Sequence, residues 1–204
     1  MTSIALPASW PEYIVTKPQK SDANVETPLF TRHSGNPILS RKDWPYPINS
    51  VFNAGAVKLA DGDTLLLCRI EDRRGLSHLC AARSTNGIDG WRIDAEPTLM
   101  ASPREFPEEI WGIEDPRITY VPELQQYAIA YTSFARGGPG VSLALTKDFK
   151  SFERYGVVMP PEDKDAALLP RKIGGRWALI HRPDHAGCTY VDLLLPRSTA
   201  LGQS

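Results

Sequence analysis

The amino-acid sequence predicts an all-β fold of antiparallel strands, and three features lead to this prediction. The apolar residues gather in short runs, each about as long as a β-strand. Turn-forming residues such as Asp61-Gly62-Asp63, Asn86-Gly87 and Gly174-Gly175 separate the runs. Two sequence elements also recur along the chain, and almost no helix is expected. The runs cover residues 54–59, 64–70, 78–83, 117–121, 127–132, 141–146 and 177–181.

Length and composition indicate an ordinary globular protein. The 204 residues are enough to bury a substantial core, and one domain is the expectation. Hydrophobic residues make up 42% of the chain and charged residues 23%, as in other globular domains. The net charge is only −1, so no overall field attracts nucleic acid or an anionic membrane. Any anion must therefore be bound by local groups.

The cysteines and the N-terminus predict a cytoplasmic protein. Cys68, Cys80 and Cys188 are odd in number and lack metal-ligand spacing, which favours reduced thiols over a disulfide framework. The first residues lack the basic start and apolar run of a signal peptide. No segment approaches the roughly 20 apolar residues of a membrane span. We therefore expect no membrane association.

Residues 1–43 read as an N-terminal lead-in to the domain. The segment is polar and interrupted by proline, and Thr27-Pro28 and Asn36-Pro37 would stop any helix that begins there. The strand pattern begins at Val51. We therefore expect the domain proper to start at residue 44.

The internal repeat indicates units of about one β-propeller blade. A strand, a small or hydroxyl residue, an Asp or Asn turn and an aromatic residue follow one another at residues 82–91 and again at 143–152. A second element, an apolar stretch with a Gly-containing turn, occurs at 57–62 and 169–175. An all-β sandwich with similar turns is the alternative.

The segment that points most directly to chemistry places two adjacent acids, Glu114 and Asp115, before Pro116 at the entrance to a strand. Side chains of neighbouring residues on an extended backbone face opposite ways. Only one of the two acids is therefore expected to reach a given cleft. The structural alternative is a carboxylate that caps backbone amides or pairs with Arg117.

The stretch Gly-Ile-Glu-Asp-Pro-Arg resembles the hallmark of glycoside hydrolase family 130, the mannoside phosphorylases and related mannosidases. Seven further motifs agree in order between residues 36 and 183. The resemblance implies a five-bladed β-propeller with an axial pocket, of which residues 44–187 would supply about three blades. The motifs lie at residues 36–39, 53–56, 66–71, 77–84, 131–132, 164–170 and 181–183.

The resemblance also implies a reaction: inverting phosphorolysis of a β-1,4-mannosidic bond, which releases mannose 1-phosphate. Asp115 would be the general acid and inorganic phosphate a co-substrate, with no metal or other cofactor. An ordinary inverting glycosidase needs a second carboxylate to activate water. Phosphate dianion is already a nucleophile, so it needs positive charge to hold it rather than a base.

The same resemblance assigns the residues that would bind phosphate and sugar. Lys164 and His181 match the phosphate-binding positions of the family, and Arg136 is a further candidate because it lies on a glycine-rich loop. The structural alternatives are a solvated lysine and a buried histidine with satisfied hydrogen bonds. For the sugar, polar side chains that can bond vicinal hydroxyls are expected at three positions. These are Asn53, Arg69 and Glu71, although Arg69 could instead pair with Glu71 or Asp72 across the strands.

Other functions remain open at this point. A hydrolase of the same family would lack the basic pair and supply a second catalytic carboxylate, and an inactive propeller fragment would bind sugar or nothing. Substrate contacts beyond the first mannose sometimes come from a neighbouring subunit in this family. A homo-oligomer is therefore one expected arrangement.

The tail, residues 188–204, resembles no propeller strand. Back-translated with one permitted set of codons and read one base later, it yields a strand, a serine, an aspartate turn and an aromatic residue, as in the repeat at 143–152. The hypothesis is a frameshift after Gly187 that leaves the product poorly soluble and inactive, since an unclosed propeller exposes a sheet edge and part of its core. Sequencing the coding DNA tests it.

Overall fold

The computed structural model describes residues 29–183. Residues up to Ser34 form a separate unit, and the following account concerns the unit that begins at Gly35. The expectations for residues 1–28 and for the tail 188–204 lie outside the described residues. In the part described, no helix is long and apolar enough to cross a membrane.

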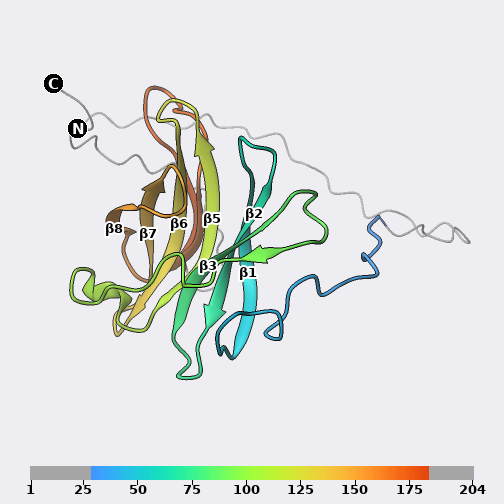
Figure 1. The fold of residues 1–204 in the computed structure, drawn as a ribbon. Helices are drawn as coiled ribbons and strands as arrows, with labels where there is room; N and C mark the ends of the chain where they lie inside the picture. The colour runs from blue at the N-terminus through green and yellow to red at the C-terminus, as the bar shows by residue number, and fades with distance from the viewer. Residues whose placement is uncertain (1–28, 184–204) are drawn as a thin grey trace, which may run out of the picture. The chain divides into compact units, whose positions relative to one another are not determined.

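The predicted all-β class is confirmed: the described chain consists of antiparallel sheets and one short 3-10 turn, η1 (Pro107–Glu109). Two sheets are four-stranded meanders, and a third contains two strands in the described residues (Figure 1). The first sheet contains β1 (Ser50–Lys58), β2 (Thr64–Glu71), β3 (Ser77–Ser84) and β4 (Arg92–Ile93). The second contains β5 (Ile113–Val121), β6 (Gln126–Ala135), β7 (Gly138–Thr146) and β8 (Glu153–Met159). The third pairs β9 (Asp163–Leu168) with β10 (Leu179–Pro183).

The second sheet is buried on both faces, which explains why β6 reads as a continuous apolar run. Tyr127, Ile129 and Tyr131 pack with the first sheet, against Leu65, Leu67 and Leu79. The residues between them, Ala128 and Ala130, pack on the other side with Ala166 and Leu168 of the third sheet. Alternate side chains of a strand face opposite ways, so this run joins two cores.

The first element of the internal repeat, at residues 82–91 and 143–152, is confirmed by its hydrogen bonds. Ser84 Oγ accepts from the backbone amides of Asn86 and Gly87, and Thr146 Oγ1 accepts from those of Asp148 and Phe149. Both hydroxyls also donate to a carbonyl five residues later, and the Asn86 and Asp148 side chains each cap two further amides. Each blade-like sheet thus leaves its third strand through the same turn.

The first strands of successive sheets adjoin, since β1 contacts β5 and β5 contacts β9. The approach of β1 to β5 depends on a glycine. A Cβ at Gly55 would lie 2.7 Å from the carbonyl oxygen of Pro116. This contact brings Asn53 close to the acid motif.

Candidate active site

The three adjoining first strands share an unusual backbone feature. Asn53 on β1, Asp115 on β5 and Asp165 on β9 all have positive φ, at 46°, 49° and 55°. Asn and Asp enter this left-handed region more readily than other non-glycine residues. The pairing of β1 and of β5 shifts register at this point, between Phe52 and Gly55 and between Glu114 and Arg117. Each irregularity re-aims the side chains beside it.

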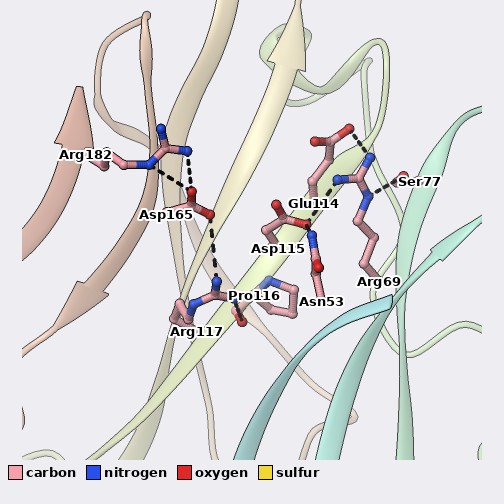
Figure 2. A network of polar contacts seen from close by, with 9 residues as sticks. All are labelled: Asn53, Arg69, Ser77, Glu114, Asp115, Pro116, Arg117, Asp165 and Arg182. Carbon is pink, nitrogen blue, oxygen red and sulfur yellow. Dashed lines mark hydrogen bonds and ion pairs between the residues drawn. The ribbon is translucent and has the colours of Figure 1, made fainter. Parts of the chain in front are cut away.

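The centre of the site is the guanidinium of Arg69 on β2 (Figure 2). Its Nη2 donates to Glu114 Oε1 at 2.8 Å and its Nη1 to Asp115 Oδ1 at 3.0 Å. Its Nε donates to Ser77 Oγ at 2.9 Å, and the group lies 4.5 Å from the centre of the Phe52 ring. All three nitrogens are therefore committed to fixed partners.

The expectation that only one of the two acids can reach a given site is wrong. Glu114 and Asp115 both contact Arg69. Alternation requires an extended backbone, and the positive φ of Asp115 at the register shift turns its side chain to the same side as that of Glu114. The site therefore holds two carboxylates.

Asp115 is held through one oxygen. Its Oδ1 accepts from Arg69 and, at 3.0 Å, from Asn53 Nδ2, which lies 62 residues away in the sequence. Within residues 29–183, Oδ2 accepts no hydrogen bond. A proton on Asp115 would therefore reside on Oδ2, since both donors occupy the other oxygen.

The two acids are partly shielded from water. The exposed fractions of the Arg69, Glu114 and Asp115 side chains are 15%, 20% and 14%. Burial raises the pKa of Glu114, and the neighbouring Asp115 and Glu71 charges act in the same direction. Arg69 and Lys164 lower that pKa. Lys164 of β9 is thus within electrostatic range of the acid motif.

The acid motif is docked against β3 by close backbone contact. Gly112 forms a parallel bridge with Ser77, and its φ is +107°. A Cβ at Gly112 would lie 2.7 Å from both the backbone nitrogen and the backbone oxygen of Ser77. Ser77 in turn holds Arg69 Nε, so the glycine sets the distance between the motif and its arginine.

The alternative pairing of Arg69 with Glu71 or Asp72 is wrong. Asp72 pairs with Arg74, and Glu71 accepts hydrogen bonds from Asn49 and Ser50. Glu71 is the last residue of β2 and acts on Glu114 through its charge.

The three predicted phosphate ligands lie in different surroundings. His181 is buried, and its Nδ1 is 2.5 Å from Asp163 Oδ2. Its Nε2 and Asp163 Oδ1 are both covered and without a hydrogen-bond partner among the described residues. Lys164 is half-buried on β9 opposite Arg182 of β10. Arg136 is exposed in the turn between β6 and β7.

A second ionic cluster adjoins the first (Figure 2). Asp165 Oδ2 accepts from Arg182 Nε and Nη2 at 3.1 and 2.5 Å, and its Oδ1 lies 3.7 Å from Arg117 Nη2. Asp165, Arg182 and Asp163 were not expected in the site, although the motifs at residues 164–170 and 181–183 contain the first two. Among residues 29–183, no cluster of His, Cys, Asp and Glu side chains is suited to hold a metal ion.

The sequence of this chain is similar to those of known proteins. The model of glycoside hydrolase family 130, described as β-1,4-mannooligosaccharide phosphorylase, matches residues 25–194. A β-1,2-mannobiose phosphorylase of Thermoanaerobacter sp. (strain X514) is 32% identical over 171 residues, which are 75% of this chain and 54% of the relative. A β-1,4-mannooligosaccharide phosphorylase of Ruminococcus albus is 28% identical over 176 residues, 83% of this chain and 51% of the relative.

Among solved structures, β-1,2-mannobiose phosphorylase of Listeria innocua matches with a TM-score of 0.66 and 24% identity, over 79% of this chain and 60% of that one. This likeness supports the fold. The chain spans about half the length of the curated relatives described above.

Proposed function

The chain belongs to glycoside hydrolase family 130, and we propose that it acts as an inverting glycoside phosphorylase on β-mannosides, with Asp115 as the general acid. The observation that carries the proposal is that Arg69 and Asn53 both donate hydrogen bonds to Asp115 Oδ1. Oδ2 is therefore the atom that would carry the proton. The transfer of a mannosyl group to phosphate would make the activity glycosyltransferase-like. The product would be mannose 1-phosphate.

The basic groups of the third sheet would receive the phosphate. Lys164 acts electrostatically on Glu114, so a phosphate beside Lys164 would lie near the acid motif. Arg136 and His181 complete the proposed set. Because His181 Nε2 is covered, its contact with phosphate requires a shift of the groups around it. Cation-rich surroundings favour a dianion nucleophile over water.

Asn53, Arg69 and Glu71 would line the sugar site beside the two carboxylates. We propose a β-1,4 linkage, which the family description and the Ruminococcus albus relative support. A relative of higher identity is named for a β-1,2 substrate, so both linkages belong in the assay. Contacts to the second sugar would come from loops or from a second copy of the chain.

The sheets would correspond to blades of a five-bladed propeller, with residues 44–187 as the catalytic domain and about three blades present. The contact between successive first strands supports this arrangement, because first strands line the axis of a propeller. A cytoplasmic location is proposed from the cysteines, since Cys68 and Cys80 are both buried free thiols.

The test is incubation of the chain with β-1,4-mannobiose and with β-1,2-mannobiose, each with and without inorganic phosphate. The proposal expects mannose 1-phosphate only when phosphate is present, and more of it from the β-1,4 substrate. Free mannose without mannose 1-phosphate would identify a hydrolase. Neither product from either disaccharide would indicate a fragment without activity.

A further inference from the structure

The second carboxylate of the acid motif has no role in the reaction proposed above. We propose that Glu114 is a specificity-determining residue that binds a hydroxyl of the reacting mannosyl unit through Oε2. This inference rests on the proposed function. It concerns a residue that a strand pattern would turn away from the site.

The contacts of Glu114 match those of Asp115. Each carboxylate gives one oxygen to the same guanidinium, and within residues 29–183 neither second oxygen has a hydrogen-bond partner. Arg69 is itself fixed by Ser77 and stacked on Phe52, so the direction of each remaining oxygen is set by a rigid support. Each carboxylate therefore keeps one oxygen that can accept a hydrogen bond from a ligand.

The position of Glu114 suits a sugar ligand better than a purely structural role. Its side chain is 20% exposed, whereas Glu109, which binds Arg154 and Tyr131 within the core, is fully buried. The hydroxyls of a pyranose are hydrogen-bond donors, and an ionised carboxylate oxygen can accept from them. A hydroxyl held by Glu114 would fix the reacting mannosyl unit beside Asp115.

The electrostatic setting allows this binding. Arg69 and Lys164 offset the charge of Glu114, and Arg69 also pairs with Asp115. The approach of an uncharged hydroxyl therefore leaves neither carboxylate without a nearby cation. The burial that raises the pKa of Glu114 also removes competing water, which strengthens a hydrogen bond to the sugar.

The experiment is a double-mutant cycle in which one change is made in the enzyme and the other in the substrate. The full chain and Glu114→Ala are assayed with β-1,4-mannobiose, with β-1,2-mannobiose and with the corresponding disaccharides that lack one hydroxyl of the non-reducing mannose. Glu114→Gln is the second variant in case alanine impairs folding, because its amide oxygen can keep the bond to Arg69. Asp63→Asn is the matched control: this carboxylate also pairs with an arginine, Arg92, but at the opposite end of β2.

With the intact disaccharide, Glu114→Ala should lower kcat/KM about 10- to 100-fold, the range for a charge-assisted hydrogen bond. With the analogue that lacks the hydroxyl bound by Glu114, the same substitution should cost less than about 3-fold, since the bond is already missing. The control should retain the parent kcat/KM with every substrate.

The two proposals fail in different ways. If the parent chain turns over mannosides but the losses from Glu114→Ala and from deoxygenation multiply at every position, Glu114 binds no hydroxyl and this inference is wrong. If the parent neither binds nor cleaves a mannoside, the proposed function fails, and the inference with it.

Discussion

Glu114 and Asp115 are consecutive on β5, yet both accept hydrogen bonds from the guanidinium of Arg69. Two carboxylates this close repel each other unless a cation lies between them. Arg69 supplies that charge together with a fork geometry that a lysine could not reproduce. The local backbone of β5, rather than its residue order, creates the pair.

Replacing Arg69 should therefore destabilise the protein through the charges it leaves behind. We expect Arg69→Met to lower the free energy of unfolding by about 3 kcal/mol, the lower end for removal of one partner from a buried ion pair. The lower end applies because the three side chains are 14–20% exposed. Urea denaturation at neutral pH measures this change.

The matched control for that experiment is Arg92→Met. Arg92 pairs with Asp63 but is 60% exposed, and exposed pairs contribute less than about 1 kcal/mol. Equal losses of unfolding free energy in the two variants would show that Arg69 contributes no more to stability than a surface arginine.

The pH dependence of stability should report on Glu114. Its pKa in the folded protein is raised, chiefly by burial, so the folded state holds this proton more tightly than the unfolded state. The resulting stabilisation is complete below the unfolded pKa, and it is lost as the pH rises through the folded pKa. Arg69, Asp115, Lys164 and Glu71 all act on this titration.

Glu114→Gln removes that titration. The free energy of unfolding of the variant minus that of the parent should therefore become more positive between pH 4 and pH 7.5. Chemical denaturation at a series of pH values gives this difference. A difference that is flat, or that falls with pH, would contradict the raised pKa.

The sequence pattern predicts most of the described strands but misses three of them, β4, β8 and β9. Each of the seven predicted apolar runs overlaps a strand. The strand β9 begins with Asp163, Lys164 and Asp165 and therefore reads as a loop. Tertiary pairing of Asp163 with His181 makes a strand there possible. The strand β8 is interrupted by Gly156 at positive φ, and β4 has only two residues, too few for a pattern.

For the site, the motifs named Asn53, Arg69 and Asp115, and in the structure Asn53 and Arg69 both donate hydrogen bonds to Asp115 Oδ1. Glu114 was missed because alternation along a strand assumes a regular register. A register shift depends on the partner strand and leaves no local signal except an Asn or Asp that tolerates positive φ.

Gly112 should be intolerant of substitution. In Gly112→Ala, positive φ costs roughly 1–2 kcal/mol, and the Cβ would lie 2.7 Å from backbone atoms of Ser77 that cannot move aside alone. We expect a total loss of about 3 kcal/mol or more. Gly75→Ala is the control because Gly75 also has positive φ but has no atom within 4 Å of its Cβ position. Similar melting temperatures for the two variants would refute the close approach.

In a version of the protein that has the length of its relatives, Asp115→Asn should abolish phosphorolysis and leave the fold intact. The asparagine oxygen can still accept the hydrogen bonds from Arg69 and Asn53, so the melting temperature should change little. Loss of a general acid typically costs about 10²–10⁴-fold in rate. Release of mannose 1-phosphate from mannobiose measures it. A rate within a few-fold of the parent would remove Asp115 from the mechanism.

Substitutions of Lys164 and His181 should both weaken phosphate binding but should differ in their effect on stability. Lys164 is half-buried and near Glu114, so Lys164→Ala should raise the KM for phosphate about 10-fold or more, the effect of a lost charge-assisted bond, and change the mannoside KM much less. His181→Ala should raise the same KM but also lower the melting temperature, because it leaves the buried Asp163 carboxylate without its partner. Initial rates at varied phosphate and fixed mannobiose give both KM values. An unchanged phosphate KM in both variants would mean that the nucleophile binds elsewhere or is water.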